Sequence, residues 1–241
     1  FFFPFETKAI KVGYSVSIGE SSLEDIRGYS KYAKDFPYVG LREKGAKEKV
    51  EAICGHSVVD TVDPVLLLTR EDWETFVDKS SPLAKEKYLL CYLIDKKPIK
   101  QNMAIAEQIA KERGLKIKYI WMHLEKESFR GNFINDASPV EFLNYMYHAS
   151  AVMTDGYHGT VFSTIFNKPM YSVINNRQST DSRIRDYLTL IGLESRIFYG
   201  DAPVIPKEEI DYTEVDPKIR SAADASKAFL QSAIDNERVV K

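Results

Sequence analysis

Apolar positions along the chain follow two alternating patterns: short runs rich in β-branched and aromatic residues, and longer segments with an amphipathic, helical spacing. In the N-terminal third, the short runs predict strands at 9–18, 37–42 and 57–68. The amphipathic segments predict helices at 22–36, 43–55 and 70–79, with Gly55 as a C-cap.

The alternation is stronger after residue 86. Residues 87–94 (KYLLCYLI) are almost continuously apolar, which is typical of a strand buried on both faces. Further strands are predicted at 116–122, 150–154 and 169–174. Helices are predicted at 99–113, 136–149, 158–167, 182–192 and 219–237, and a surface loop at 200–218. Ser138 with Glu141 forms a candidate capping box for the second of these helices.

Strands that alternate with helices of about 10 to 15 residues indicate parallel sheets with helices on both faces. The polar segment 77–87 separates the two alternations and is the best domain boundary. We therefore expect an α/β chain of two Rossmann-like domains that face a cleft. Residues 1–80 are predicted to be the C-terminal part of an incomplete first domain, and residues 81–241 a second domain with a C-terminal helix.

Composition narrows the function classes. The chain has 33 basic and 35 acidic residues and a net charge of −2, so it lacks the basic footprint of a nucleic-acid binder. No apolar run reaches the roughly 18 to 20 residues that cross a bilayer, so no transmembrane segment is expected. The cysteines, Cys54 and Cys91, lie in apolar surroundings without a Cys-x-x-Cys or paired-His spacing. They are predicted to be buried thiols, and no metal site is expected.

Residues 154–169 (TDGYHGTVFSTIFNKP) place His158 where a strand gives way to a helix. Ligands of open parallel sheets bind at such places, and the N–H groups of a helix N-terminus attract anions. The amides of Gly159 and Thr160 are therefore candidate donors, with Asp155 as a further candidate for substrate binding. His158 is not needed for packing and is a candidate to exchange protons with a substrate. The alternative is a structural histidine satisfied by Asp155 or by backbone.

Three arginines are candidates to bind an anion, because a guanidinium matches the geometry of a carboxylate or phosphate. Arg183 is predicted in the first turn of a helix, where an anionic partner would offset its unfavourable interaction with the helix dipole. Arg177 is close to it in sequence, and a solvated ion-pair cluster is the alternative for both. Arg42 ends a predicted strand, with an exposed turn beside Glu43 as the alternative. If the domains face each other, Arg42 is expected to meet His158 and Arg183.

The chain resembles the polysaccharide pyruvyl transferase family through most of its length. The motifs that carry this resemblance are VGYSVSIG, GLREKGA, DTVDPVLLL, DASPVEFL, TDGYHGTVFSTIFNKP and SRIRDYLTLIGLESR. Members open with a strand and an Asn-Tyr-Gly-type loop, which are absent here. We therefore expect the chain to begin partway through a protein.

The resemblance implies a fold similar to the GT-B type and transfer of pyruvate from phosphoenolpyruvate to a sugar diol, giving a cyclic ketal. The acceptor would be a cell-surface polysaccharide or its precursor, which includes lipid-linked forms. His158 matches the acid/base histidine of the family, Arg42 the arginine of its Ser/Gly-x-Arg-Glu/Asp turn, and Arg183 the arginine after the histidine helix. Arg177 is a rival to Arg183, because the intervening segment varies in length.

The expected partners are therefore phosphoenolpyruvate and a saccharide, without a cofactor or a metal. The expected location is the cytoplasm, and a peripheral position at the inner face of the membrane is left open. The alternative function is that of a GT-B type glycosyltransferase that uses a nucleotide sugar. The oligomeric state is not predicted.

Overall fold

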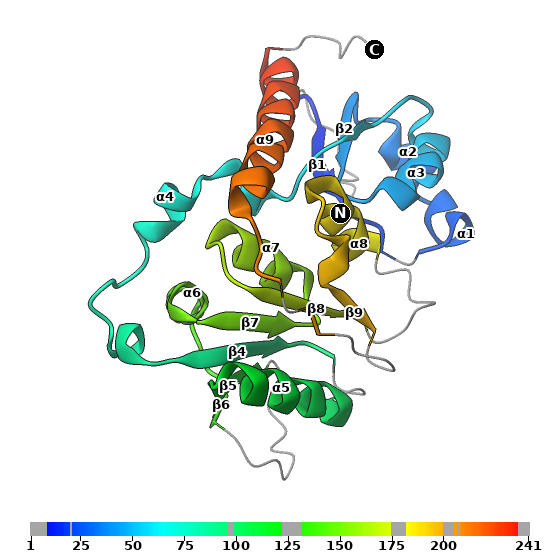
Figure 1. Ribbon diagram of the computed structural model, residues 1–241. Coiled ribbons are helices and arrows are strands. Elements are labelled where there is room, and N and C mark those ends of the chain that lie inside the picture. The colour runs from blue at the N-terminus through cyan, green and yellow to red at the C-terminus, as the bar shows by residue number, and fades with distance from the viewer. Residues whose placement is uncertain are drawn as a thin grey trace. The chain divides into compact units, whose positions relative to one another are not determined.

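Figure 1 shows the computed structural model of the chain, which describes residues 9–19, 21–95, 99–121, 132–174, 182–199, 205–206 and 208–235. These residues fall into two compact units. The first unit is drawn from Phe1–Leu67, Thr180–Asp186 and Thr213–Lys241, and the second from Leu68–Ser179 and Tyr187–Tyr212. Each unit is built around one parallel β-sheet.

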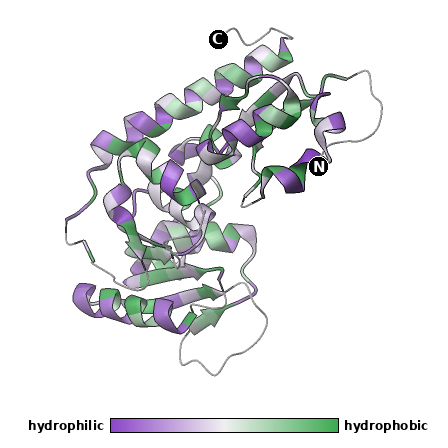
Figure 2. Cartoon of the chain, turned by 90° about the vertical axis from the view of Figure 1, so that its right-hand side faces the viewer, coloured by the Kyte–Doolittle hydropathy of each residue, from purple (hydrophilic) through white to green (hydrophobic). Residues whose placement is uncertain are grey.

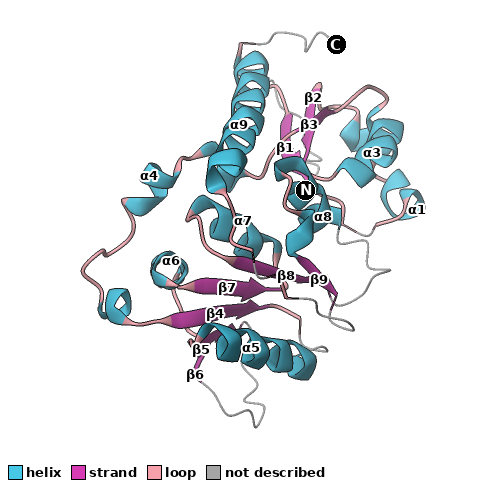
Figure 3. Ribbon diagram, in the orientation of Figure 1, coloured by secondary structure: helices cyan, strands magenta, loops and turns pink. Residues whose placement is uncertain are grey.

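The second unit contains a six-stranded sheet in the order β6-β5-β4-β7-β8-β9 (Figure 3). Its strands are β4 (Tyr88–Leu93), β5 (Lys116–Trp121), β6 (Asn132–Ile134), β7 (Ala151–Thr154), β8 (Met170–Ile174) and β9 (Ile197–Tyr199). Counted from β4, this is the 3-2-1-4-5-6 order of a doubly wound Rossmann fold. The order reverses between β4 and β7, so their carboxyl ends form the topological switch point at which such folds bind ligands.

Helices cover both faces of this sheet. Helix α5 (Ile99–Arg113) lies on one face, and α6 (Pro139–His148) and α7 (Tyr157–Ile165) lie on the other (Figure 1). Alternate residues of β4 serve the two faces: Leu89, Cys91 and Leu93 pack with α5, while Tyr88 donates a hydrogen bond to the Tyr145 carbonyl oxygen of α6 at 2.8 Å. Figure 2 accordingly shows mostly hydrophobic strands, beside helices in which hydrophobic and hydrophilic residues alternate. The continuous apolar run of β4 follows from burial on both sides.

The remaining helices of the second unit are short or shared. They are α4 (Arg70–Glu74), η3 (Pro82–Lys85), η4 (Glu194–Arg196) and part of α8 (Ser182–Ile191). Trp73 of α4 packs edge-on against Phe162 of α7, with ring centroids 5.0 Å apart. The first turn of α8 belongs to the first unit.

The first unit contains a three-stranded parallel sheet in the order β1-β2-β3. Its strands are β1 (Val12–Val16), β2 (Tyr38–Leu41) and β3 (Val59–Asp60). The helices α1 (Leu23–Arg27), α2 (Ser30–Ala33) and α3 (Lys47–Cys54), with the turn η1 (Lys44–Ala46), pack on one face around an apolar cluster. Cys54 belongs to this cluster and Cys91 to the core of the second unit, so both thiols are buried, as predicted.

The opposite face of this small sheet is covered by α9 (Tyr212–Ile234). Phe229 packs with Tyr38, and its ring centroid lies 6.4 Å from that of Tyr14. The Val62 N–H donates to Ser226 Oγ of α9 at 3.0 Å. The C-terminal helix was predicted to belong to the second domain; it is grouped with the first because its apolar side completes the burial of the three-stranded sheet. The division after Leu67 also differs from the predicted boundary at residue 80.

Several predicted elements are confirmed. The predicted helix 99–113 is α5, and the capping box of Ser138 and Glu141 opens α6 as expected. The predicted helix 158–167 is α7 to within two residues at either end. Gly55 adopts a φ of 79° as the C-cap of α3.

Other predicted elements are wrong in extent. The predicted helix 22–36 breaks at Gly28 and Tyr29 into α1 and α2. The predicted strand 57–68 shrinks to β3, because Pro64 has no N–H for the sheet and instead opens the 3-10 turn η2 (Pro64–Leu67). Strands β6 and β9 were not predicted, since three residues carry too little periodicity to be recognised. Helix α9 begins inside the predicted loop 200–218.

We expect Phe229→Ala to lower the free energy of unfolding of the first unit by about 3 kcal/mol, because it removes the buried aromatic ring with which α9 packs on the sheet. Urea titrations of the protein test this. The matched control on the same helix is Ile234→Ala, since Ile234 is 75% exposed and its loss should matter little. Equal effects of the two substitutions would contradict the assignment of α9 to this sheet.

Candidate functional site

The carboxyl ends of β4 and β7 meet at the switch point of the second unit. His158 is the second residue of α7, directly beyond β7, and its side chain is exposed. Its ring contacts that of Tyr157 edge-on, with centroids 5.6 Å apart. His158 therefore lies where open parallel sheets bind ligands, at the N-terminus of a helix, as the sequence predicted.

The first turn of α7 is held close to the sheet by two glycines. A Cβ at Gly159 would lie 2.3 Å from Thr154 Oγ1 and 2.8 Å from Tyr92 Cδ1. A Cβ at Gly156 would lie 2.4 Å from Ile94 Cδ1. No larger residue fits either place without a shift, and the close approach fixes the turn that carries His158 against β4 and β7.

Asp155 belongs to the same turn and ties it to the residues that follow β4, across the switch point. Its Oδ1 accepts a hydrogen bond from the Ile94 N–H at 2.7 Å. Its Oδ2 accepts from the Asp95 N–H at 3.2 Å and from Asn102 Nδ2 at 3.1 Å. Burial raises the pKa of this carboxyl from 3.8 to about 6, against the opposing effect of the backbone donors, so it is ionised at neutral pH. Asp155 was predicted to bind substrate; its described hydrogen bonds are all to protein donors, and the substrate-binding role stays a prediction.

Thr160 also differs from its predicted role as an anion donor. Its N–H donates to the Gly156 carbonyl oxygen at 3.1 Å, as the helix requires. Its hydroxyl lies 2.8 Å from Ser172 Oγ of β8, and the residue is fully buried. Thr160 therefore joins α7 to the sheet. Of the two amides predicted to bind an anion, that of Gly159 remains a candidate, because it lies in the first turn of the helix.

A second group of charged residues lies at the carboxyl ends of the strands in the first unit. Arg42 follows β2, and its Nη1 donates to Asp63 Oδ2, beyond the end of β3. The other oxygen of Asp63 accepts from the Val65 N–H at 3.1 Å. The Arg42 side chain is only 17% exposed, which excludes the alternative of an arginine on an exposed turn. The ion pair fixes the orientation of the guanidinium.

Arg183 reaches the same turn from α8. Its Nε lies 3.9 Å from Glu43 Oε1, and its side chain is 36% exposed. Asp186, three residues later, accepts a hydrogen bond from the Lys44 N–H at 2.9 Å. Arg183 was expected to come from the second domain, but its described partner Glu43 places it in the first unit.

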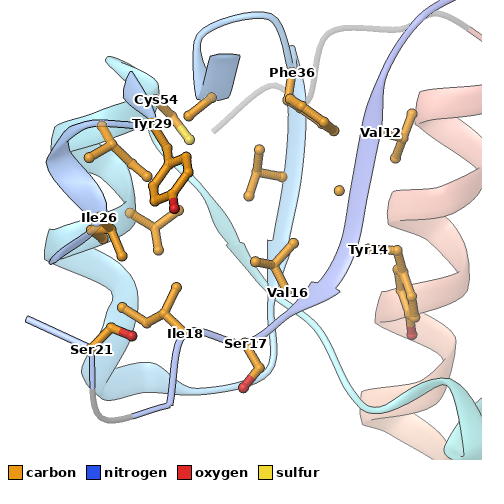
Figure 4. Close-up of a pocket in the computed structure, with 15 residues that line it drawn as sticks. Val12, Tyr14, Val16, Ser17, Ile18, Ser21, Ile26, Tyr29, Phe36 and Cys54 are labelled. Atoms are coloured by element: carbon orange, nitrogen blue, oxygen red, sulfur yellow. The ribbon is translucent and has the colours of Figure 1, made fainter. Parts of the chain in front are cut away.

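The first unit also holds an apolar cavity of about 480 Å³ between β1 and the helices α1 to α3 (Figure 4). Val16, Ile18, Ile26 and Tyr29 are in its lining. Ser17 lines it too, and its hydroxyl donates to Glu43. The cavity wall is mostly apolar, so the groups suited to an anion are those of the neighbouring turn.

The structure thus gathers the predicted residues in two places. Arg42 and Arg183 share the first unit, and His158 and Gly159 share the switch point of the second. Arg177 lies outside the described residues. That His158 and the arginines meet in one pocket stays a prediction.

Sequence reasoning missed the carboxylates and the amide that hold these groups. Glu43 and Asp63 were passed over, although Glu43 directly follows Arg42 and Asp63 precedes a strand-breaking proline. Asn102 is fully buried on α5, whose other buried residues are apolar. A polar residue on the apolar face of a predicted helix is a signal that the sequence does contain.

The described part of the chain holds no group of three or more His, Cys, Asp or Glu side chains arranged to bind a metal ion. Among its helices, none has both the length and the apolar character needed to cross a membrane.

The sequence signature of a known family matches residues 2–177, described as polysaccharide pyruvyl transferase. The chain belongs to the polysaccharide pyruvyl transferase family. The family is one of transferases that modify saccharides. The matched range includes Arg42 and His158, whereas Arg183 lies beyond it. A comparison with curated protein sequences found no match.

Solved structures give an independent view of the fold. A UDP-N-acetylglucosamine 2-epimerase from Rickettsia bellii is 12% identical, with a TM-score of 0.54, and the match covers 92% of this chain and 66% of that one. The UDP-GlcNAc 2-epimerase from Neisseria meningitidis, bound to UDP-GlcNAc, is 10% identical, with a TM-score of 0.50 and coverage of 93% and 68%. At such identities the likeness shows the GT-B-like α/β fold alone, which confirms the predicted fold class.

The chain spans 55% of the length of a third epimerase, from Methanocaldococcus jannaschii, and about two thirds of the other two.

We expect Gly159→Ala to lower the free energy of unfolding by about 1 to 3 kcal/mol, because the new methyl group meets Thr154 and Tyr92 at sub-contact distances. Urea titration measures this loss. The control is Gly28→Ala, where the backbone has a φ of −59° and nothing lies within 4 Å of an added Cβ. A Gly159→Ala variant as stable as this control would refute the close packing of α7.

The raised pKa of Asp155 makes stability depend on pH. Between pH 3.8 and about 6 the folded state binds more protons than the unfolded state, so the free energy of unfolding falls as the pH rises through this window. The expected fall is about 3 kcal/mol and is complete above pH 6. Urea titrations from pH 4 to 7 should show this fall in the protein and lose it in Asp155→Asn. The exposed Asp136→Asn serves as control, and a fall that persists in Asp155→Asn would exclude Asp155 as its source.

Proposed function

We propose that the protein transfers pyruvate from phosphoenolpyruvate to two hydroxyl groups of a saccharide, forming a cyclic ketal and releasing phosphate. The observation that carries the proposal is the position of His158, at the switch point of a sheet within the residues that match the family. An exposed imidazole there has access to a bound substrate. The arginines of the first unit supply groups suited to a donor that carries both a carboxylate and a phosphate.

The chemistry needs proton transfers at defined moments. Protonation of the methylene carbon of phosphoenolpyruvate turns it into a methyl group and leaves C2 electron-poor. One sugar hydroxyl adds to C2 and gives up its proton. The second hydroxyl then displaces phosphate from C2, its proton leaves, and the ketal closes. His158 is proposed as the group that gives and takes these protons, an effect of about 10² to 10⁴ in rate.

The arginines are proposed to act on charge rather than on protons. Arg42, oriented by Asp63, is suited to a bidentate contact with the carboxylate or phosphate of the donor. Arg183, and Arg177 as its rival, would stabilise the departing phosphate. The acceptor is proposed to be a polysaccharide precursor, including a lipid-linked one, used on the cytoplasmic side of the membrane. The two buried thiols fit a reducing compartment.

We expect His158→Ala to lower the rate of phosphate release, in the presence of acceptor, by at least about 10²-fold. Because the side chain is exposed, the free energy of unfolding should change by less than about 0.5 kcal/mol. The control His148→Ala removes another histidine of the second unit, which contacts the Asp78 carbonyl oxygen at 2.9 Å and should keep the rate. An unchanged rate in His158→Ala would remove His158 from the mechanism.

The donor is tested by ligand-dependent stability, since a ligand that binds only the folded state raises the melting temperature. Phosphoenolpyruvate is expected to raise it in proportion to the logarithm of its concentration. A shift with a nucleotide sugar, and none with phosphoenolpyruvate, would favour a GT-B type glycosyltransferase instead.

A further inference from the structure

Among the described charged side chains of the first unit, that of Glu43 is the most deeply buried, at 1% exposure. It follows Arg42 directly, at the carboxyl end of β2. Burial of an ionised carboxylate is costly unless hydrogen bonds and opposite charges compensate for the lost water. The groups that hydrogen-bond to Glu43 or pair with it therefore indicate its structural role.

Those partners come from two distant segments of the chain. Ser17 Oγ donates to Oε1, and the Ile18 N–H donates to Oε2 at 3.2 Å. The third partner, the Arg183 guanidinium, has its Nε 3.9 Å from Oε1. Glu43 thus joins the loop after β1 to the first turn of α8.

A second carboxylate secures the same turn of α8. Asp186 lies three residues after Arg183, so both project from one side of the helix. Asp186 accepts from the Lys44 N–H at 2.9 Å. Burial raises the pKa of Asp186, and the amides of Lys44 and Gly45 oppose this rise. Residues 43–45 and the start of α8 are therefore tied together twice, once through the Asp186 carboxylate and once through the Arg183 side chain.

We propose that Glu43 is a positioning residue that holds Arg183 beside the Arg42 turn, so that both guanidiniums serve one anion-binding surface of the first unit. The identity of the anion, phosphoenolpyruvate, rests on the proposed function. Glu43 touches neither donor nor acceptor and acts through Arg183.

Whether Glu43→Gln strengthens or weakens the binding of the anion distinguishes a positioning role of Glu43 from an effect of its charge alone. The amide keeps an oxygen to accept from Ser17 or Ile18, but it loses the charge that holds Arg183. The variant gains one unit of positive charge, which by itself would strengthen the binding of an anion. Positioning predicts the opposite: weaker binding, because Arg183 is no longer oriented.

The test measures phosphoenolpyruvate binding by calorimetry in the protein, in Glu43→Gln, in Arg183→Ala and in the double variant. Each single substitution is expected to raise Kd by about tenfold, and the double variant should bind no more weakly than Arg183→Ala alone. The control Glu24→Gln removes the same charge from an exposed site of the first unit and should not raise Kd. Binding in Glu43→Gln as tight as in the unaltered protein, or additive effects in the double variant, would overturn the proposal.

Hydrogen exchange of residues 186–190, whose N–H groups lie beyond the unpaired first four of α8, gives a measurement that needs no ligand. These amides should exchange faster in Glu43→Gln than in the unaltered protein or in Glu24→Gln. Equal exchange would overturn the tether whether or not phosphoenolpyruvate binds. Faster exchange in a protein that fails to bind phosphoenolpyruvate would instead leave the tether standing and reject the proposed donor.

Discussion

Compensation of buried carboxylates by hydrogen bonds is the constraint on which the candidate site depends. Loops at the carboxyl ends of parallel strands carry backbone N–H groups that the sheet does not use. Glu43, Asp63 and Asp155 each accept from such groups and from a side chain that extends from another segment. The acids therefore set the shape of the loops that present Arg42, Arg183 and His158.

The loops that carry the candidate residues are fixed by different interactions in the two units. In the second unit, close packing of Gly156 and Gly159 against β4 and β7 adds to the hydrogen bonds of Asp155, so the turn before His158 is fixed by sterics and by charge. In the first unit, ion pairs dominate, and the start of α8 is drawn to the end of β2. The imidazole thus lies on a turn held by close packing, and the guanidiniums lie on side chains held by ion pairs, and this is the arrangement on which the proposed transfer chemistry depends.

Prediction succeeded where the signal is local. The continuous apolar run of β4, the length of α5 and the capping box of α6 all follow from residues within one segment. It failed where long-range packing overrides a local preference, as for α9, whose start reads as an acidic, proline-containing loop. It also failed for β6 and β9, which exist because a neighbouring strand supplies their hydrogen bonds.

The sequence by itself determined the α/β class, the family, and the position of His158 between a strand and a helix, because these depend on periodicity and on motifs of adjacent residues. Only the tertiary structure decided that α9 and Arg183 belong with the first sheet, and that Asp155 and Thr160 hydrogen-bond to groups of the protein. The reason is that a hydrogen bond or ion pair is a property of two segments. Glu43 and Arg183 are close in space, but no local pattern in the sequence indicates that they pair.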